Sequence, residues 1–332
     1  MTVSYFYRKP VFLYSIERVF DTVQSAMPKS VVARNVYCRY SRGILGRVRN
    51  MLDARRQQSD VNHITGEVHY LAMLLNRRRT VLTIHDCGTL RRMSGWRREL
   101  ARLFWFEWPT RRATIVTVIS ENTKLELLRH TACPEAKVSV IPDPLPPGFT
   151  PSKKAFNNTE PRLLQVGALE NKNLERVAAA LSGIHCHLTI VGRLSTDQVS
   201  VLEANGICYS VLSDISDADL LEVYRGADVI LFCSTYEGFG MPIIEGNGIG
   251  RPVVTSDIEP LRSIANGAAC LVNPYDTVSI RAGIQRVLCD RAYREDLVTR
   301  GYANVARFDA TVVANRYLEI YQRLLTPVGS CE

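Results

Sequence analysis

The chain has 332 residues, 46% of them hydrophobic, and a formal net charge of +8, so two hydrophobic cores of ordinary size are expected. It contains no run of 18 apolar residues, and Met1–Pro10 lacks the apolar core of a signal peptide, which predicts a cytoplasmic protein that spans no membrane. Nine cysteines without a Cys-x-x-Cys pair argue against a zinc site or a disulfide framework and favour a reducing compartment.

Basic residues are concentrated in the first half of the chain. Residues 1–150 hold 24 Lys and Arg against 12 Asp and Glu, whereas the remaining residues hold 17 against 21. This asymmetry indicates that the first half meets an anionic partner. Nucleic acid and anionic lipid both fit that description.

The first half alternates short apolar runs with helical patterns, as an α/β layer does. Ser120 is placed to cap a helix that begins at Glu121 and ends near His130. Prolines then crowd together between residues 142 and 151, which is the strongest linker signal in the chain. The predicted strands of this half are residues 60–65, 80–85, 113–120 and 137–141.

The second half repeats the alternation of strands and helices. Ser216, with Asp219 three residues later, predicts the capped start of a helix. Two successive βα runs predict two doubly wound parallel sheets, and such sheets bind ligands at the carboxyl ends of their strands. The predicted strands are residues 162–167, 187–192, 227–233 and 251–256, and the predicted helices are residues 173–181, 197–205, 220–226 and 311–325.

The most informative segment follows the predicted strand at 227–233. It carries two carboxylates, Glu237 and Glu245, separated by seven residues. Gly238 and Gly240 allow a sharp turn and a close approach of backbone amides to a ligand, and Pro242 suits the first turn of a helix. A strand, a glycine turn and a helix N-terminus flanked by carboxylates would suit a polyhydroxylated, phosphorylated ligand.

A second candidate loop follows the predicted strand at 162–167. It runs from Gly167 through Lys172 and Asn173, and a lysine at a strand end that faces a helix start is a plausible anion site. Arg193, just after the next strand, is a candidate second cation.

These segments resemble motifs of one enzyme family. Glu237 to Glu245 is similar to the Glu-x7-Glu motif of retaining, nucleotide-sugar-dependent glycosyltransferases of the GT-B fold, the large family-four group of mannosyl- and glucosyltransferases. Gly167 to Asn173 resembles the family's G-x-x-x-x-K-N loop, and His85 followed by an aspartate matches its "HD" pattern. The resemblance implies two Rossmann-like domains that face each other across a cleft.

The resemblance also implies catalytic roles. Glu237 would face the transferred sugar, and Lys172 would neutralise the nucleotide diphosphate. His85, from the first domain, would meet the donor sugar and help to stabilise positive charge at the anomeric carbon. The mechanism implied by the family is front-face displacement without a catalytic metal or another cofactor.

Further residues would bind the donor. Glu245 would accept hydrogen bonds from the ribose hydroxyls, and Arg193 would assist Lys172 at the diphosphate. Ser213 lies where relatives place the loop that contacts the base. The backbone amides of Gly238, Phe239 and Gly240 would hold the hydroxyls of the sugar.

The chain departs from the family pattern in places. Ala168 stands where relatives often carry arginine, and Arg262 and Ser263 replace the usual Pro-Glu. The glycine-rich loop near the N-terminus is missing, since Arg8-Lys9-Pro10 stands in that region. His63 and His69 could line the acceptor side, but a core position is at least as good an explanation for both.

Residues 90–112 interleave arginines with aromatic side chains, including all three tryptophans. Such a segment suits the headgroup region of an anionic membrane, although its aromatic residues could instead pack in the core. Asp217-Ala-Asp219 resembles a metal-binding Asp-x-Asp signature but is better explained as acidic helix capping. No GxGxxG or Walker loop follows a strand, so dinucleotide or ATP chemistry has little support.

We therefore expect an acceptor-binding, membrane-facing domain at residues 1–150 and a nucleotide-sugar-binding domain at 151–310. A helix at 311–332 would return to the first domain. The expected activity is retaining transfer of a hexose from GDP-mannose or a UDP-hexose to a lipid-linked glycan of a bacterial surface polysaccharide, at the inner face of the membrane. The alternatives are an epimerase of the same fold, or a binding protein for anionic lipid or nucleic acid without turnover.

Overall fold

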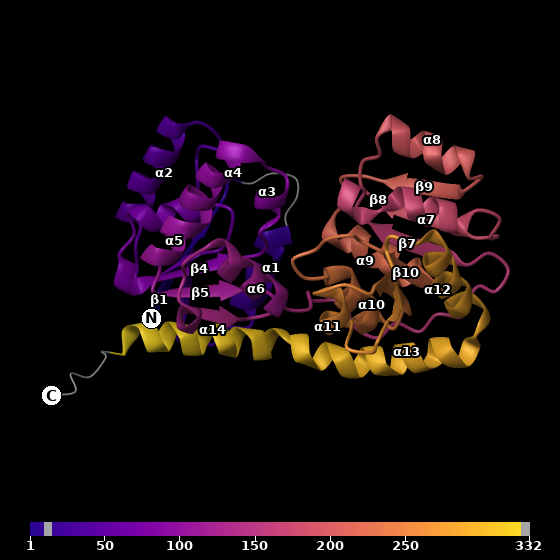
Figure 1. The fold of residues 1–332 in the computed structure, drawn as a ribbon. Helices are drawn as coiled ribbons and strands as arrows, with labels where there is room; N and C mark the ends of the chain where they lie inside the picture. The colour runs from indigo at the N-terminus through magenta and orange to yellow at the C-terminus, as the bar shows by residue number, and fades with distance from the viewer. Residues whose placement is uncertain (10–14, 327–332) are drawn as a thin grey trace. The chain divides into compact units, whose positions relative to one another are not determined.

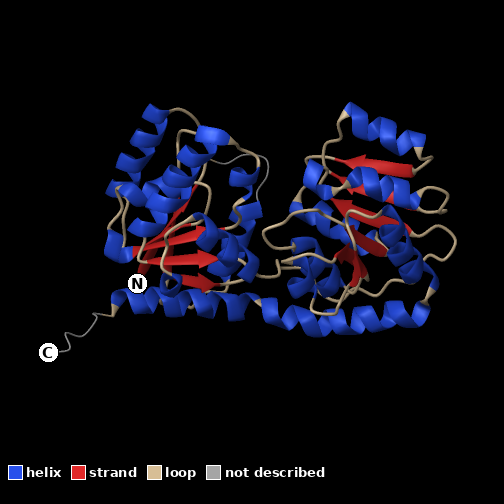
Figure 2. Ribbon diagram, in the orientation of Figure 1, coloured by secondary structure: helices blue, strands red, loops and turns tan. Residues whose placement is uncertain are grey.

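The computed structural model describes residues 1–9 and 15–326, so Pro10 in the segment Arg8-Lys9-Pro10 and residues 327–332 of the expected C-terminal helix lie outside the described residues. The chain divides into two compact units. Unit 1 comprises Met1–Pro144 together with Ala310–Glu332, and unit 2 comprises Leu145–Asp309. Figure 1 labels many of the elements of each unit, and Figure 2 separates helices from strands by colour.

Unit 1 contains a six-stranded sheet in the order β2-β1-β3-β4-β5-β6, and its neighbouring strands pair in parallel. The strands are β1 (Thr2–Tyr7), β2 (Val32–Tyr37), β3 (Val61–Ile64), β4 (Thr80–Ile84), β5 (Ile115–Val118) and β6 (Val138–Val140). The α-helices are α1 (Ser15–Ser25), α2 (Ile44–Arg56), α3 (Gly88–Arg91), α4 (Gly95–Ala101), α5 (Trp108–Arg112), α6 (Glu121–His130) and α14 (Ala310–Leu325). A π-helical turn, Arg102–Glu107, joins α4 to α5.

Helices cover both faces of this sheet because its central strands are apolar on both sides. In β1, Tyr5 belongs to the core beneath α1 and α14, whereas the adjacent Phe6 belongs to the core on the opposite face. Tyr317 and Tyr321 of α14 are buried in the first of these cores, so the C-terminal helix is part of unit 1.

Unit 2 contains a second six-stranded parallel sheet, in the order β12-β11-β10-β7-β8-β9. Its strands are β7 (Arg162–Val166), β8 (His187–Val191), β9 (Cys208–Leu212), β10 (Val229–Phe232), β11 (Val253–Ser256) and β12 (Cys270–Val272). Its α-helices are α7 (Leu174–Leu181), α8 (Thr196–Ala204), α9 (Asp217–Gly226), α10 (Met241–Ile249), α11 (Leu261–Ala265), α12 (Thr277–Cys289) and α13 (Arg291–Asn304).

The two sheets confirm the predicted doubly wound α/β architecture, and each predicted strand is present. Both predicted caps are confirmed as well. The Ser120 side chain accepts a hydrogen bond from the Thr123 amide at the start of α6. Ser216 and Asp219 form a reciprocal capping box at the start of α9, which confirms the capping interpretation of the Asp-x-Asp sequence.

None of the helices among the described residues is both long enough and apolar enough to cross a membrane. The segment at 90–112 instead forms the short helices α3 to α5 and the π-helical turn between them.

Candidate functional site

The candidate site of unit 2 lies where its strand order reverses direction. The first strand of the unit, β7, lies between β8 and β10, so the connections that follow β7 and β10 leave the sheet toward opposite faces. Ligands of doubly wound sheets bind at such a switch point, outside the carboxyl ends of the strands. Both sequence motifs of the second half occupy these two connections.

The loop after β7 is held in place by backbone conformation and by buried hydrogen bonds. Gly167 has a φ of 95°, and a Cβ there would lie 2.8 Å from Cε of Lys172, so glycine is required for the lysine to fold back. Asn173 adopts a left-handed conformation, with a φ of 62°. Its buried side-chain amide donates to the carbonyls of Cys233, at 3.0 Å, and Pro274, at 2.7 Å. These bonds attach the loop after β7 to the segments that follow β10 and β12.

The structure brings Lys172 and Glu237 into direct contact. Lys172 Nζ lies 2.6 Å from Glu237 Oε1, and the two side chains are only 18% and 16% exposed. The Asn171 side-chain amide donates to the same carboxylate oxygen at 3.2 Å, and the Asn171 carbonyl accepts from the Thr235 amide at 2.8 Å. Sequence reasoning missed Asn171, because nothing in the local pattern shows that it bridges the two loops.

Two buried polar atoms beside these loops lack a hydrogen-bond partner among the described residues. They are Gln165 Oε1 in β7 and Ser234 Oγ after β10. Buried polar groups are normally paired, and unpaired ones are often found at functional sites. Their position at the switch point agrees with a ligand-binding role for this edge of the sheet.

The glycine turn before α10 has the conformation that its sequence indicates. Gly240 has a φ of 148°, and a Cβ there would lie 3.0 Å from Leu261, so a larger residue would be strained. The Phe239 ring is buried edge-to-face against Phe308, with ring centroids 5.6 Å apart, and is therefore a packing group. Gly238 is partly buried.

Glu245 is the fifth residue of α10 and is 2% exposed. The Tyr224 hydroxyl of α9 donates to Glu245 Oε2 at 2.6 Å. Sequence reasoning did not single out Tyr224, because its distance from Glu245 depends on how α9 packs against α10. The carboxylate of Glu245 is thus oriented by a buried phenol.

Arg193 and Ser213 lie on the exposed rim of the same sheet edge. Arg193 follows β8 and forms an ion pair with Asp214 at 2.8 Å, and its side chain is 77% exposed. Ser213 follows β9 and is exposed. Arg193 and Ser213 therefore lie just beyond the carboxyl ends of β8 and β9. The Arg193 guanidinium is already paired with Asp214.

His85 belongs to unit 1 and follows β4. Its Nε2–H donates to the Thr65 carbonyl at 2.7 Å. Gly66 has a φ of 144°, and a Cβ there would lie 2.7 Å from His85 Cδ2, so this glycine allows the ring to approach the backbone. Burial raises the pKa of nearby Asp143 to about 6, and the charge of His85 opposes that rise.

The other two histidines considered for the acceptor side are core residues. His63 is buried, with Nδ1 2.6 Å from the Tyr321 hydroxyl and Nε2 2.7 Å from Thr83 Oγ1. His69 is buried with Nδ1 2.7 Å from the Trp105 carbonyl. Burial lowers the pKa of His63 to about 3 and that of His69 to about 4, so both are neutral at physiological pH.

The aromatic segment at 90–112 divides between core and surface. Phe106 is buried and Trp105 packs against the core of unit 1, as the alternative interpretation expected for some of these rings. Trp96, Phe104 and Trp108 are exposed instead, and Trp96 retains 70% of its accessible surface.

Two protein-family models match the chain, one in each half. Residues 149–304 match the family model described as "Glycosyl transferases group 1", and residues 18–147 match that of "Glycosyltransferase Family 4". The two matches together cover most of the chain.

Curated relatives carry glycosyltransferase names. The chain is 33% identical over 113 residues to the O-antigen chain mannosyltransferase B of Escherichia coli, a match that covers 34% of this chain and 30% of the relative. It is 25% identical over 249 residues to the O-antigen chain mannosyltransferase RfbU of Salmonella typhimurium, covering 73% and 68% of the two chains. The chain thus spans under a third of the length of the E. coli relative and about two thirds of that of the Salmonella relative.

Solved structures share the fold over nearly the whole chain. Anabaena Alr3699/HepE in complex with UDP-glucose superposes with a TM-score of 0.79 at 14% identity, over 97% of this chain and 99% of the other. WaaG, a glycosyltransferase involved in lipopolysaccharide biosynthesis, superposes with a TM-score of 0.73 at 14% identity, again over 97% and 99%. At this level of sequence identity, the structural similarity establishes the fold alone.

Proposed function

The chain belongs to the GT-B glycosyltransferases of the mannosyl- and glucosyltransferase group, and from that premise we propose that it transfers a hexose with retention of configuration. The donor is GDP-mannose or a UDP-hexose, and the acceptor is a hydroxyl of a lipid-linked glycan. The observation that carries this proposal is the contact between Lys172 and Glu237 at the switch point of unit 2.

We propose that the cation and the carboxylate of this contact meet the diphosphate and the sugar of a nucleotide-sugar donor. The diphosphate is anionic and suits the Lys172 amine and the N-terminus of α7, while the sugar hydroxyls suit the Glu237 carboxylate and the amides of the 238–240 turn. Arg193 lies on the exposed rim of the same edge and would supply a second cation after leaving Asp214. Ser213, at the end of β9, would lie toward the base.

The proposed reaction is a front-face displacement. The bond between the anomeric carbon and the diphosphate oxygen breaks while the acceptor oxygen approaches from the same side, and the leaving diphosphate takes the acceptor proton. Lys172 offsets the charge that builds on the leaving group, and Glu237 orients the sugar and stabilises its positive charge. His85 of unit 1 is proposed as a further contact to the donor sugar. No metal ion or other cofactor is needed in this proposal.

The donor candidates are those suggested by the relatives. Curated relatives are named as mannosyltransferases, and Anabaena HepE binds UDP-glucose. The proposed site holds hydroxyls and a diphosphate, which GDP-mannose and UDP-hexoses share.

Nucleotide binding can be measured through thermal stability. A ligand that binds only the folded protein raises its stability by RT ln(1 + [L]/Kd), about 2.7 kcal/mol at 100 times Kd. We expect one nucleotide among a panel of UDP, GDP and dTDP and their sugars to raise the melting temperature, and Glu245→Ala to remove most of that rise because a ribose contact is lost.

Because Glu245 is buried, the ligand-induced shift is compared within each variant rather than the melting temperature itself. Glu203→Ala, on the exposed side of α8, is the matched control and should keep the full shift. A shift of normal size in Glu245→Ala would remove Glu245 from the donor site, and no shift with any nucleotide would contradict the donor proposal.

We also propose that a lipid-linked acceptor is reached through the surface of unit 1. Unit 1 exposes the apolar side chains of Ile44 and Leu45 on α2, and those of Trp96 and Phe104 in the 90–112 segment. The two parts adjoin, since the Arg47 guanidinium of α2 lies 4.5 Å from the ring centroid of Trp105. Apolar groups among arginines suit an anionic membrane surface.

Sedimentation with phospholipid vesicles measures this association. The double substitution of Ile44 and Leu45 by serine is expected to lower binding to phosphatidylglycerol-containing vesicles about 100-fold or more, because full burial of each side chain in lipid contributes roughly 1.5–3 kcal/mol. Val278→Ser on α12 removes an equally exposed side chain of unit 2 and should have no effect. Equal losses in both variants, or equal binding to pure phosphatidylcholine, would contradict the proposal.

A further inference from the structure

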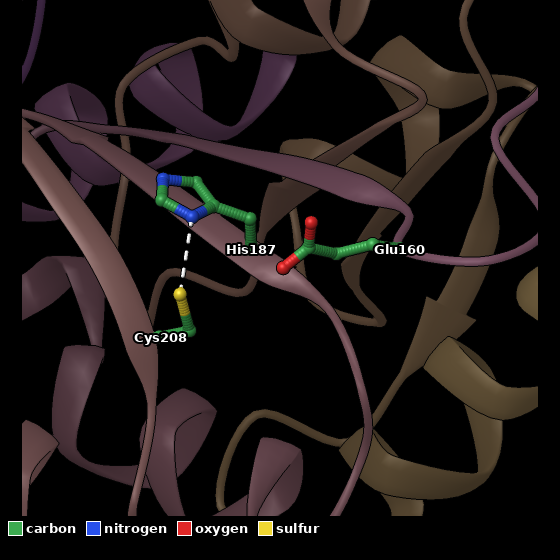
Figure 3. A group of neighbouring side chains, drawn as sticks. All are labelled: Glu160, His187 and Cys208. Atoms are coloured by element: carbon green, nitrogen blue, oxygen red, sulfur yellow. Dashed lines mark hydrogen bonds between the residues drawn. The ribbon is translucent and has the colours of Figure 1, made fainter.

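A second group of side chains lies at the opposite edge of the unit 2 sheet, where β7, β8 and β9 begin. Glu160 precedes β7 by two residues, His187 is the first residue of β8, and Cys208 is the first residue of β9. One ligand atom from each lies within 4.8 Å of the other two (Figure 3). Carboxylate, imidazole and thiolate are the three protein ligands that zinc prefers.

Backbone pairing holds this group together. His187 and Cys208 are direct partners in the parallel register of β8 and β9. The His187 amide donates to the Pro161 carbonyl at 3.0 Å, which brings the neighbouring Glu160 to the start of β8. The pairing of β8 with the chain at the start of β7 and with β9 therefore sets all three positions.

The separations suit a tetrahedral metal ion. His187 Nδ1 and Cys208 Sγ lie 3.3 Å apart. A zinc ion with bonds of about 2.1 Å to nitrogen and about 2.3 Å to sulfur separates the two ligand atoms by roughly 3.6 Å. Glu160 and Cys208 are exposed, so side-chain rotation can bring the carboxylate to the ion, and a fourth position stays open to water.

The hydrogen bonds around His187 leave its Nδ1 atom available to bind a metal ion. Its Nε2 lies 3.0 Å from Ser210 Oγ, and the Ser210 hydroxyl donates to Thr189 Oγ1 at 3.4 Å. Ser210 then accepts the Nε2–H, so Nδ1 carries the lone pair and faces Cys208 (Figure 3). An acceptor that orients the second nitrogen is the usual companion of a ligating histidine.

We propose that Glu160, His187 and Cys208 form a zinc site that is separate from the donor site. The donor motifs lie at the carboxyl ends of the strands, and this group lies at their amino ends, roughly 15 Å away along a five-residue strand such as β8. The bound ion cross-links the segment before β7 to the edge strand β9. The site is thus separate from the proposed transfer chemistry.

Cobalt(II) is the spectroscopic probe, because it takes the same ligands as zinc and a thiolate–cobalt bond absorbs in the near ultraviolet. One equivalent of cobalt added to the full-length protein, in a phosphine reductant, is expected to produce this band. Zinc should remove the band by displacement and raise the melting temperature of the protein.

Substitutions test each ligand in turn. None of the three side chains is fully buried, so the variants are expected to fold. Cys208→Ser and His187→Gln should abolish the band and weaken zinc binding about 100-fold or more, a larger loss than second-sphere changes cause. Glu160→Gln should weaken zinc binding about tenfold or more, with the band retained. Ser210→Ala should weaken it about tenfold while leaving all three ligands in place.

Cys289→Ser is the matched control, since Cys289 is another exposed free thiol of unit 2. His185→Gln controls for a neighbouring exposed histidine. Both should bind cobalt normally. A wild-type protein without the thiolate–cobalt band, a band that survives Cys208→Ser, or a band lost equally in Cys289→Ser would overturn the proposal, whatever the outcome of the donor experiments.

Discussion

Glu237→Ala is expected to lower the turnover number for sugar transfer roughly 100-fold or more, the usual effect of losing one well-placed transition-state contact. Glu237 is proposed to orient the sugar and to stabilise the positive charge that develops at the anomeric carbon. In the structure its carboxylate is held by Lys172 and Asn171, so its position is set before the donor arrives. The measurement is the rate of radiolabelled sugar transfer from the preferred donor to lipid-linked acceptor.

A second variant at this position separates charge from shape, and a variant of an exposed carboxylate elsewhere in unit 2 is the control. Glu237→Gln keeps the size of the side chain and a hydrogen-bonding amide but removes the negative charge, so it should lose most of the same activity. Glu203→Ala, an exposed carboxylate of α8, should transfer sugar at the normal rate. Near-normal turnover of Glu237→Ala would remove Glu237 from the reaction.

Lys172→Ala is expected to cause a loss of similar size, roughly 100-fold or more in turnover, because the charge on the departing diphosphate would no longer be offset. The substitution also removes the partner of Glu237. Donor affinity should fall as well, since the diphosphate is present in the ground state, whereas in Glu237→Ala the loss should lie mainly in turnover. Steady-state rates with varied donor concentration distinguish the two patterns.

Lys153→Ala removes an exposed lysine of the same unit and should leave both constants unchanged. The double variant of Lys172 and Glu237 should lose less than the product of the two single losses, because the two side chains are in contact and act on one donor. Fully multiplicative losses would show that the two residues act independently. Unchanged kinetics in Lys172→Ala would contradict the diphosphate role.

Much of the fold could be predicted from the sequence because its signals are local. The apolar run at 227–233, the glycine turn and the helix start that follow it lie next to one another in the chain, and the structure contains β10, the turn and α10 in that order. The capping box at Ser216 is equally local. Each signal depends on residues within a few positions, so periodicity and turn chemistry suffice.

Strands without a clear local signal were missed. In the edge strand β2, five of six residues are exposed, and the edge strand β9 has no fully buried residue, so neither shows the apolar run of a central strand. The sequence analysis also predicts no strand at β1 or β12; β12 has only three residues, whereas β1 is largely buried.

By itself, the sequence determined the two doubly wound domains and the family, together with Lys172, Glu237 and Glu245 as candidates, since these follow from motifs whose residues are close in the chain. Only the tertiary structure decided that Lys172 contacts Glu237, 65 positions away, because β7 and β10 are neighbours in the sheet. It also showed His63 and His69 to be buried core residues. The group of Glu160, His187 and Cys208 has no recognisable spacing, because strand pairing, not chain proximity, brings those side chains together.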